Sequence, residues 1–405
     1  MTDRNNDSIL LNRNFLAVAA INFLVMVSYY LLFVISIPYA IESFHTSTSI
    51  AGLVAGSMVL GSLAGRFVTG RLIDLAGFKK ILFFGIVELV ISLALYLAVN
   101  SLPLLIFVRF LSGVGVGCIG TVTGTIVAHI VPPHQHGVGI SYFSMSTILA
   151  MAIGPFLGIY LMQSVSYTTQ FLLCLAFGTL CLFIAFALSV ERQRVARTAS
   201  HDIDALFSLS QYIDYRAVPI ATVMLAVSLC YASVQAFISY YAKEIRLIDA
   251  ASIFFLVYAV VVFFSRPVTG KIFDRRGENV VVYPSLLILA CGLALLSRAD
   301  SEWMLLLSAA LIGGGFGNFQ STIQAISVKV VPPHRFGQAT STFFIFFDFG
   351  IGFGPYFLGL AEPYTGYRGM YLMMAALALL SIPLYGVLHG RKKTKRYQAE
   401  NPGEK

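Results

Sequence analysis

The sequence has very little charge. Only 11% of its 405 residues are Asp, Glu, Lys or Arg, whereas 58% are hydrophobic, and the mean hydropathy is +0.81. Soluble globular domains carry roughly a quarter of their residues as charged side chains, because water-facing surface has to be polar. This composition therefore excludes a soluble globule and predicts a chain that folds in a lipid bilayer.

The sequence also lacks the patterns of cofactor sites. Its 5 cysteines form no CxxC pair and all fall in apolar runs, so we expect free, packed thiols. No Gly-rich loop ends in Lys-Ser/Thr, which excludes ATP hydrolysis by a phosphate-binding loop. The segment GVGCIG at 115–120 has dinucleotide spacing but no strand before it, and His134 and His136 lack further metal ligands. We expect no cofactor, no metal site and no enzymatic activity.

Long apolar runs, in contrast, recur along the whole chain. A helix needs about 20 apolar residues to cross a hydrocarbon core of roughly 30 Å. Twelve runs meet this length, and we predict spans at 14–38, 48–72, 79–98, 102–128, 138–162, 168–189, 217–241, 250–272, 279–296, 303–328, 338–360 and 369–389.

The net charge of +8 has a one-sided distribution. Of the 27 lysines and arginines, 20 fall on one side of the predicted spans, 4 on the other, and Arg66, Arg109 and Arg266 lie within spans. Basic loops face the cytoplasm, so we expect both termini there and a multi-pass protein of the bacterial inner-membrane type. The same distribution gives no reason to expect a nucleic-acid partner.

Segments 200 residues apart match in register. RFVTGRLIDLAG at 66–77 corresponds to RPVTGKIFDRRG at 266–277, and VPPHQHG at 131–137 corresponds to VPPHRFG at 331–337. Such duplication predicts two pseudo-symmetric six-helix bundles with a solute cavity between them. The predicted parts are a first bundle (1–189), a cytoplasmic linker (190–216), a second bundle (217–389) and a basic cytoplasmic tail (390–405).

The residues GRLIDLAGFKK at 70–80 resemble the loop between spans two and three of the major facilitator superfamily. RFLSGVGVG at 109–117 and AMAIGPFLG at 150–158 resemble span-four and span-five motifs of its bacterial drug/proton antiporters, the twelve-span multidrug efflux group. The resemblance covers essentially the whole chain and implies the major facilitator fold and export. The sequence departs from these motifs at Leu75, Ala150, Ile159, Glu278 and Asn279.

Two sets of candidate residues concern movement. The gating-loop candidates, for which a plain cytoplasmic turn is the alternative, are Gly70, Arg71, Asp74, Gly77, Lys79, Lys80, Gly270, Asp274, Arg275 and Gly277. Small residues let helices approach closely and proline weakens the helical hydrogen-bond ladder, so hinges are predicted at such positions. The hinge candidates are Gly154, Pro155, Gly158, Gly354 and Pro355.

Charged side chains within spans are costly and therefore functional candidates. Asp348 and Glu88 are proton-coupling candidates because buried carboxyl groups can bind and release protons, and Arg109 is one by its resemblance to the span-four motif. Structural alternatives stay open. Arg109 could snorkel outward, Glu88 could pair with another helix, and Asp348 could form a helix–helix hydrogen bond.

Uncommon polar and aromatic residues within spans are candidates for the substrate cavity, or else for contacts between helices. They are Asn22, Tyr29, Tyr231, Gln235, Asn318, Gln320 and Gln324. An aromatic, sparsely charged pocket suits small amphipathic molecules.

The expected function is secondary active transport, namely proton-coupled efflux of small amphipathic molecules or drugs by alternating access. The expected partners are a small-molecule substrate, protons and the lipid bilayer, and we expect a monomer. A proton-linked importer or a uniporter of a nutrient or metabolite is the alternative. A non-transporting receptor or an intramembrane enzyme belongs to a different class, and the sequence offers neither a sensing domain nor a catalytic cluster for it.

Overall fold

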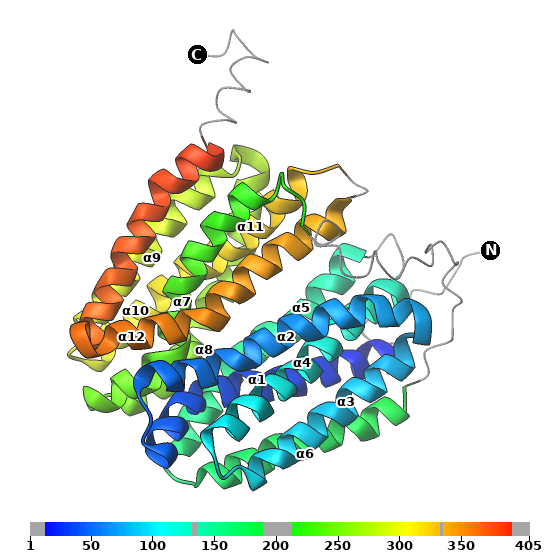
Figure 1. The fold of residues 1–405 in the computed structure, drawn as a ribbon. Coiled ribbons are helices and arrows are strands. Elements are labelled where there is room, and N and C mark those ends of the chain that lie inside the picture. Colours follow the sequence, from blue (N-terminus) through cyan, green and yellow to red (C-terminus); the bar gives the residue numbers. More distant parts are fainter. Residues whose placement is uncertain (1–12, 132–135, 189–212, 333–334, 391–405) are drawn as a thin grey trace. The chain divides into compact units, whose positions relative to one another are not determined.

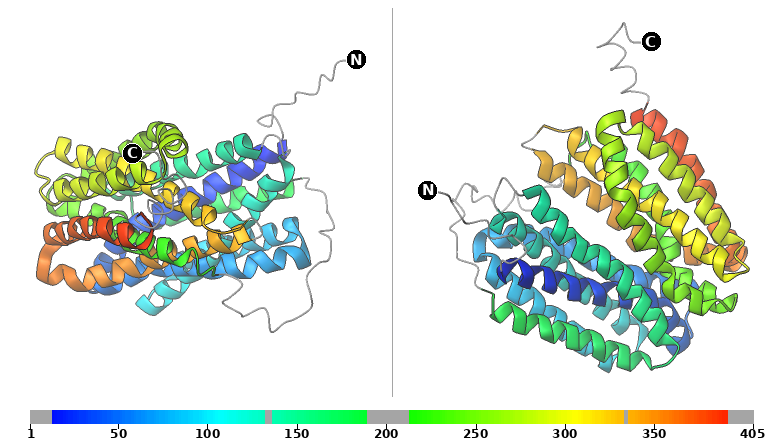
Figure 2. Two further views of the ribbon diagram at one scale, coloured as in Figure 1. Left: turned by 90° about the horizontal axis from the view of Figure 1, so that it is seen from above. Right: turned by 180° about the vertical axis from the view of Figure 1, so that it is seen from behind.

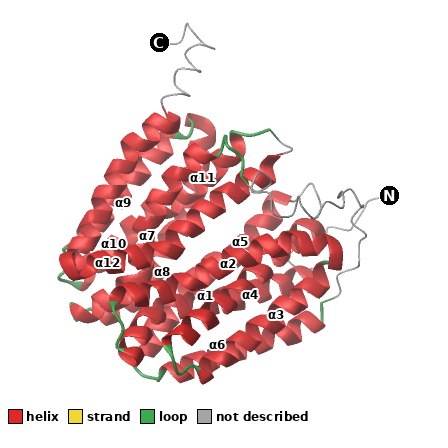
Figure 3. Ribbon diagram, in the orientation of Figure 1, coloured by secondary structure: helices red, strands yellow, loops and turns green. Residues whose placement is uncertain are grey.

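The chain is helical wherever its structure is described. The computed structural model describes residues 13–131, 136–188, 213–332 and 335–390, and these contain helices and loops but no strand (Figure 3). The predicted fold class, an all-α membrane protein, is confirmed. Most of the predicted linker and all of the tail after Gly390 lie outside the described residues.

Six helices form the first half, and they run alongside one another (Figures 1 and 2). They are α1 (Arg13–Phe44), α2 (Thr48–Ala76), α3 (Phe78–Leu95) with the 3-10 turn η2 (Tyr96–Ala98), α4 (Leu102–Ile130), α5 (His136–Met162) and α6 (Tyr167–Phe186). Local chemistry sets two of their starts. Pro103 occupies the first turn of α4, where its missing N–H costs nothing. Ser166 caps α6 by accepting a hydrogen bond from the Thr169 N–H at 3.3 Å.

The second half repeats this order with two local differences. Its helices are α7 (Val218–Glu244), α8 (Ile248–Arg276), α9 (Asn279–Ser297), α10 (Glu302–Ile312), the π-helical segment η6 (Gly313–Gly317), α11 (Asn318–Lys329), α12 (Phe336–Tyr385) and the π-helical segment η8 (Gly386–Gly390). The segment η6 divides the predicted span 303–328. Inside α12, Gly366 has φ 63° and ψ 173°, a conformation that no α-helical residue adopts, and the predicted spans 338–360 and 369–389 lie on either side of it.

These differences bear on the number of spans. Among the described residues, 10 helices are long and apolar enough to cross a membrane. The two pieces of 302–329 are each too short to be counted, because η6 interrupts them, and α12 with η8 is counted as one continuous helix despite the bend at Gly366. The expected number of twelve stays a prediction.

The chain folds into two compact units. The first comprises Met1–Ser47 and Leu53–Thr198, and the second comprises Thr48–Gly52 and Ala199–Lys405. The short segment Thr48–Gly52, at the start of α2, therefore belongs with the second unit although the rest of α2 belongs with the first.

A glycine-lined helix crossing holds the centre of the first unit together. Gly61 and Gly65 of α2 face the backbone of α4, and Gly113 and Gly117 of α4 face the backbone of α2. At each of the four positions a Cβ would overlap a main-chain carbonyl of the other helix. Only glycine permits this approach, which replaces side-chain packing by backbone contact.

The five cysteines are free thiols, as predicted. Cys174, Cys181 and Cys230 are buried and Cys118 is half-buried, whereas Cys291 is exposed on α9. The expectation that all five thiols are packed is therefore wrong for Cys291, because its position on α9 faces outward from the unit.

Candidate functional site

Arg109 of α4 lies inside the first unit, with only 1% of its surface exposed. Its guanidinium donates three hydrogen bonds to main-chain carbonyls. Nε donates to Val54 O at 2.7 Å and Nη2 to Ala55 O at 3.2 Å, both on α2, and Nη1 donates to Leu32 O of α1 at 3.0 Å. The side chain therefore does not snorkel outward. It ties α1, α2 and α4 together, and its planar fork of donors is what allows three acceptors to be reached at once.

Glu88 of α3 points toward α4. Its carboxylate lies against Gly115, where an added Cβ would overlap Oε2. Both carboxylate oxygens are buried and, within the part of the chain that is described, neither has a hydrogen-bond partner. An acid in such surroundings is costly when charged, and this is the property a proton-binding group needs.

Asp348 lies on α12 of the second unit and is 4% exposed. A group of aromatic rings from three elements includes its neighbour in sequence, Phe347. Phe316 of η6 stacks on Tyr231 of α7, with ring centroids 4.0 Å apart and planes at 8°, and the Phe316 ring also lies 6.5 Å from the ring of Phe347. The second unit thus combines a buried carboxyl with an aromatic cluster, defined here as Tyr231, Phe316 and Phe347.

Two of the polar cavity candidates make contacts between helices. Asn22 of α1 donates from Nδ2 to Ser146 Oγ at 2.8 Å and to Thr147 Oγ1 at 2.9 Å on α5. Asn318 of α11 accepts hydrogen bonds from Thr269 and Ser265 on α8, at 3.0 and 3.2 Å. These contacts match the alternative of helix–helix bonding for both residues. Gln235 is 4% exposed, and Tyr29, Gln320 and Gln324 are half-buried.

The hinge candidates lie where helices cross closely. A Cβ on Gly154 of α5 would stand 2.8 Å from Val27 O of α1, and one on Gly158 would stand 3.1 Å from Leu31 O. In the second unit a Cβ on Gly354 of α12 would stand 2.8 Å from the Cβ of Ala232 on α7. Pro155 and Pro355 follow inside α5 and α12. Both units therefore place the glycine–proline pair at equivalent crossings, and the hinge role stays a prediction.

Only some of the gating-loop candidates have side chains that the structure describes. The side-chain surroundings of Gly70, Arg71 and Asp74 are not described. Gly77 and Gly277 both have φ 83°, a left-handed conformation that favours glycine, and both end the preceding helix at the same place. Gly270 has no atom within 4 Å of its Cβ position, so it makes no close helix approach. The other members of the set, Lys80, Asp274 and Arg275, are exposed.

Lys79 makes a specific contact at the start of α3. Its Nζ donates to Leu188 O, just beyond the end of α6, at 2.8 Å. A cation at the carboxyl end of a helix meets unpaired carbonyls and the negative end of the helix dipole. Lys79 therefore holds the start of α3 to the end of α6.

A buried ionic cluster in the second unit was not among the candidates. Glu278, at the start of α9, is 2% exposed and contacts His389 Nε2 at 3.0 Å and Lys329 Nζ at 3.7 Å. The sequence did point to Glu278, because this acid stands where the loop motif of the major facilitator superfamily has a basic residue. Its partners could not be found, because His389 lies 111 residues away.

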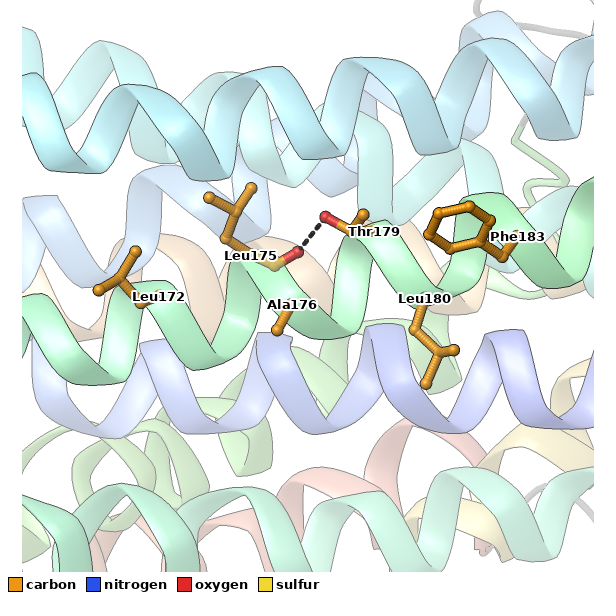
Figure 4. Close-up of a pocket in the computed structure, with 6 residues that line it drawn as sticks. All are labelled: Leu172, Leu175, Ala176, Thr179, Leu180 and Phe183. Atoms are coloured by element: carbon orange, nitrogen blue, oxygen red, sulfur yellow. Dashed lines mark hydrogen bonds between the residues drawn. The ribbon is translucent and has the colours of Figure 1, made fainter.

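A surface hollow lies on α6. Figure 4 shows its six lining residues, Leu172, Leu175, Ala176, Thr179, Leu180 and Phe183, all on that single helix. The Thr179 hydroxyl donates to Leu175 O at 2.7 Å within the helix. No group of three or more His, Cys, Asp or Glu side chains that could hold a metal ion occurs among the described residues.

Comparisons with known proteins identify relatives over most of the chain. The sequence model of the Major Facilitator Superfamily matches residues 18–355 and, in a second match, 281–404. An uncharacterized MFS-type transporter of Salmonella typhimurium is 26% identical over 361 residues, covering 86% of this chain and 90% of the relative. One of Methanocaldococcus jannaschii is 23% identical over 339 residues, covering 81% and 86%.

Solved structures of transporters have the same fold. The crystal structure of the nucleoside transporter NupG matches with a TM-score of 0.75 and 15% identity, covering 93% of this chain and 99% of that one. The inward-open xylose transporter XylE from E. coli matches with a TM-score of 0.72 and 15% identity, covering 91% and 94%. At these identities the likeness concerns the fold alone.

Proposed function

We propose, from the premise that this chain belongs to the Major Facilitator Superfamily, that it exports small amphipathic molecules in exchange for protons. Membership establishes a multi-pass membrane transporter of the MFS type. The direction, the coupling ion and the substrate class are the proposed part.

The observation that carries the proposal is the burial of Asp348 in the unit that also holds the aromatic cluster. A buried carboxylate and the stacked rings of Tyr231 and Phe316 within one unit would offer an amphipathic solute both a charge and an apolar surface. A proton and a cationic solute compete for the same carboxylate, because each neutralises it. Competition of this kind produces exchange: the proton that arrives displaces the solute, and the next solute displaces the proton.

Glu88 offers a second protonatable group in the other unit, whereas Arg109 has a different role in this scheme. A guanidinium stays charged at every accessible pH. With its donors engaged by carbonyls of α1 and α2, it positions these helices rather than carrying the proton.

Alternating access needs each bundle to move as a body. The absence of a side chain at Gly154 and Gly354 brings α5 close to α1 and α12 close to α7, which favours helix pairs that move together within each unit. Rocking of two such bundles alternately exposes a site near the midplane.

Flux in proteoliposomes tests the proposal. We would impose a pH gradient of either sign and offer lipophilic cations, nucleosides and sugars. Efflux of lipophilic cations driven by inward proton movement is expected, and Asp348→Asn should abolish the pH dependence. The exposed Asp300→Asn is the matched control and should behave as wild type.

Two outcomes would contradict the proposal in different ways. Uptake of a sugar or nucleoside together with protons would establish the importer instead. If Asp348→Asn and Glu88→Gln each left proton-driven flux unchanged, the assignment of proton coupling to these two residues would be wrong. The protein would still be a transporter.

A further inference from the structure

The π-helical segment η6 is packed closely on both sides. A Cβ on Gly313 would stand 2.7 Å from Tyr258 O of α8, and one on Gly315 would stand 2.5 Å from Leu289 N of α9. The counterpart of Gly313 in the first unit, Gly113, is packed just as closely against α2 but lies in an unbroken α-helix. Close glycine packing therefore does not explain why only the second unit has a π-helical turn here.

Asn318, the first residue after η6, makes a hydrogen bond that the main chain gives up. In an α-helix its main-chain N–H would donate to the carbonyl four residues earlier, Gly314 O. Here that N–H donates to Gly315 O, and the side chain takes its place, with Nδ2 donating to Gly314 O at 2.7 Å. A buried carbonyl that loses its helical donor needs such a replacement. The counterpart Cys118 has no amide to offer, and its helix is regular.

The amide of Asn318 is held in one orientation by α8. Its Oδ1 accepts hydrogen bonds from Thr269 at 3.0 Å and Ser265 at 3.2 Å, and Nδ2 also donates to Ser265 Oγ at 2.9 Å. With only 3% of the residue exposed, water does not compete for these contacts. The plane of the amide is therefore fixed, with Nδ2 directed at Gly314.

The winding of η6 matters because this segment carries one ring of the aromatic cluster. Phe316 is 1% exposed and stacks on Tyr231 of α7 at 4.0 Å, with the Phe347 ring of α12 at 6.5 Å. The direction of a helical side chain follows from the turn of the backbone, so the π-helical turn decides where Phe316 points. In the first unit the equivalent positions hold Val116 and Leu31, which are not aromatic. The π-helical turn and the ring stack thus occur together.

We infer that Asn318 is a positioning residue of the aromatic cluster: by bonding the Gly314 carbonyl it keeps η6 π-helical and so holds the Phe316 ring on that of Tyr231. The consequence for solutes rests on the proposed function, in which this cluster is an apolar surface. Phe347 is half-buried whereas the other two rings are buried, so a solute contacts the cluster through Phe347, which Phe316 backs. An ordered ring favours flat aromatic cations over compact aliphatic ones. Asn318 thereby sets specificity without touching the solute.

Fluorine NMR of the full-length protein in lipid nanodiscs, with fluorotyrosine at position 231, measures the position of the Phe316 ring. A ring stacked face to face shifts the resonance upfield, and Phe316→Leu supplies the unstacked value. Asn318→Leu keeps the size of the side chain but cannot donate to Gly314 O. We expect it to move the resonance at least half of the way to the unstacked value.

Thr269→Val is the matched control. It removes a hydrogen bond to the same amide from α8 but keeps the bond from Nδ2 to Gly314 O, so the resonance should stay close to that of the wild type. Asn318→Cys gives the second unit the residue of the first and should behave as Asn318→Leu does. The test therefore does not depend on a single variant that has to fold.

Two results would overturn the inference. Equal shifts in Asn318→Leu and Thr269→Val would show that Asn318 only ties α11 to α8. An unchanged resonance in both Asn318 variants would show that other contacts hold Phe316.

Flux measurements separate this inference from the proposed function. In Asn318→Leu the KM for ethidium, a flat aromatic cation, should rise about two- to tenfold, the range that aromatic pairs contribute, with kcat unchanged. The KM for tetraethylammonium should stay the same. An equal rise for both cations would contradict the role in specificity. If neither cation is carried, the proposed function fails, whereas the fluorine resonance still decides whether Asn318 positions Phe316.

Discussion

Gly113 of α4 lies directly against the main-chain carbonyl of Met58 on α2, with no room for a Cβ between the two helices. The contact joins backbone to backbone. Any larger residue at this position must push the helices apart.

The first prediction is that Gly113→Ala destabilises the protein. Overpacking costs about 1–3 kcal/mol, and here the obstacle is a rigid main chain rather than a flexible side chain. Thermal unfolding can be followed with a thiol-reactive dye, because Cys174, Cys181 and Cys230 are buried and become reactive only on unfolding. We expect a clear fall in the midpoint temperature.

Gly124, on the same helix, is the matched control. No atom lies within 4 Å of its Cβ position. Gly124→Ala should therefore leave the midpoint unchanged or raise it, since alanine favours a helix by up to about 1 kcal/mol over glycine. Equal destabilisation by the two substitutions would mean that the crossing of α2 and α4 is not the cause.

A second prediction separates charge from geometry at Arg109. Arg109→Lys keeps the positive charge but replaces a fork of donors by one ammonium, which cannot reach the carbonyls of Leu32, Val54 and Ala55 together. We expect a loss of flux of about tenfold or more together with a lower unfolding midpoint. The exposed Arg298→Lys serves as control. Wild-type flux in Arg109→Lys would show that charge alone matters there.

A third prediction couples Glu88 to Gly115. Gly115→Ala should destabilise the wild type, because the new methyl group displaces the Glu88 carboxylate from its place against α4. In a Glu88→Ala background that obstacle is gone, so the second substitution should cost less. A double-mutant cycle of unfolding free energies measures the difference, and contacting residues commonly show coupling of about 0.5–3 kcal/mol. Strict additivity would place the carboxylate somewhere other than against Gly115.

Much of the architecture could be predicted from the sequence, because the hydropathy pattern and the internal repeat each extend over many residues. The repeat at 200 extends even to contacts, since positions 78 and 129 meet in the first unit as 278 and 329 do in the second. The π-helical segment Gly313–Gly317 could not be predicted. Its glycines carry no side-chain periodicity, and the aligned Gly113, Gly115 and Gly117 lie in an unbroken α-helix.

Partners were harder to predict than candidate residues. Arg109 stood out as a buried charge, yet its acceptors are main-chain carbonyls, which every residue carries and no pattern distinguishes. Glu278 stood out as a departure from a motif, but nothing local points to His389. Side-chain chemistry can be read along the chain, whereas pairing depends on which helix ends meet in three dimensions.

The last prediction uses the repeat as its own control. Asn318 hydrogen-bonds to Ser265 and Thr269 of α8, while its counterpart Cys118 donates a long, weak thiol hydrogen bond to Gly65 O at 3.6 Å. The two residues hold equivalent helix pairs, α11 to α8 and α4 to α2, but the amide makes stronger and more numerous hydrogen bonds than a thiol.

Asn318→Ala should therefore lower the free energy of unfolding by about 1–2 kcal/mol, whereas Cys118→Ala should change it by less than about 0.5 kcal/mol. Asn318→Cys gives the second unit the residue of the first and should fall between the two. The first unit tolerates a weak bond here because Gly61 and Gly65 already bring α2 and α4 into backbone contact. The second unit has Val261 and Ser265 at those positions, so its polar bonds have to hold the helices. Equal costs at 118 and 318 would contradict this division of roles.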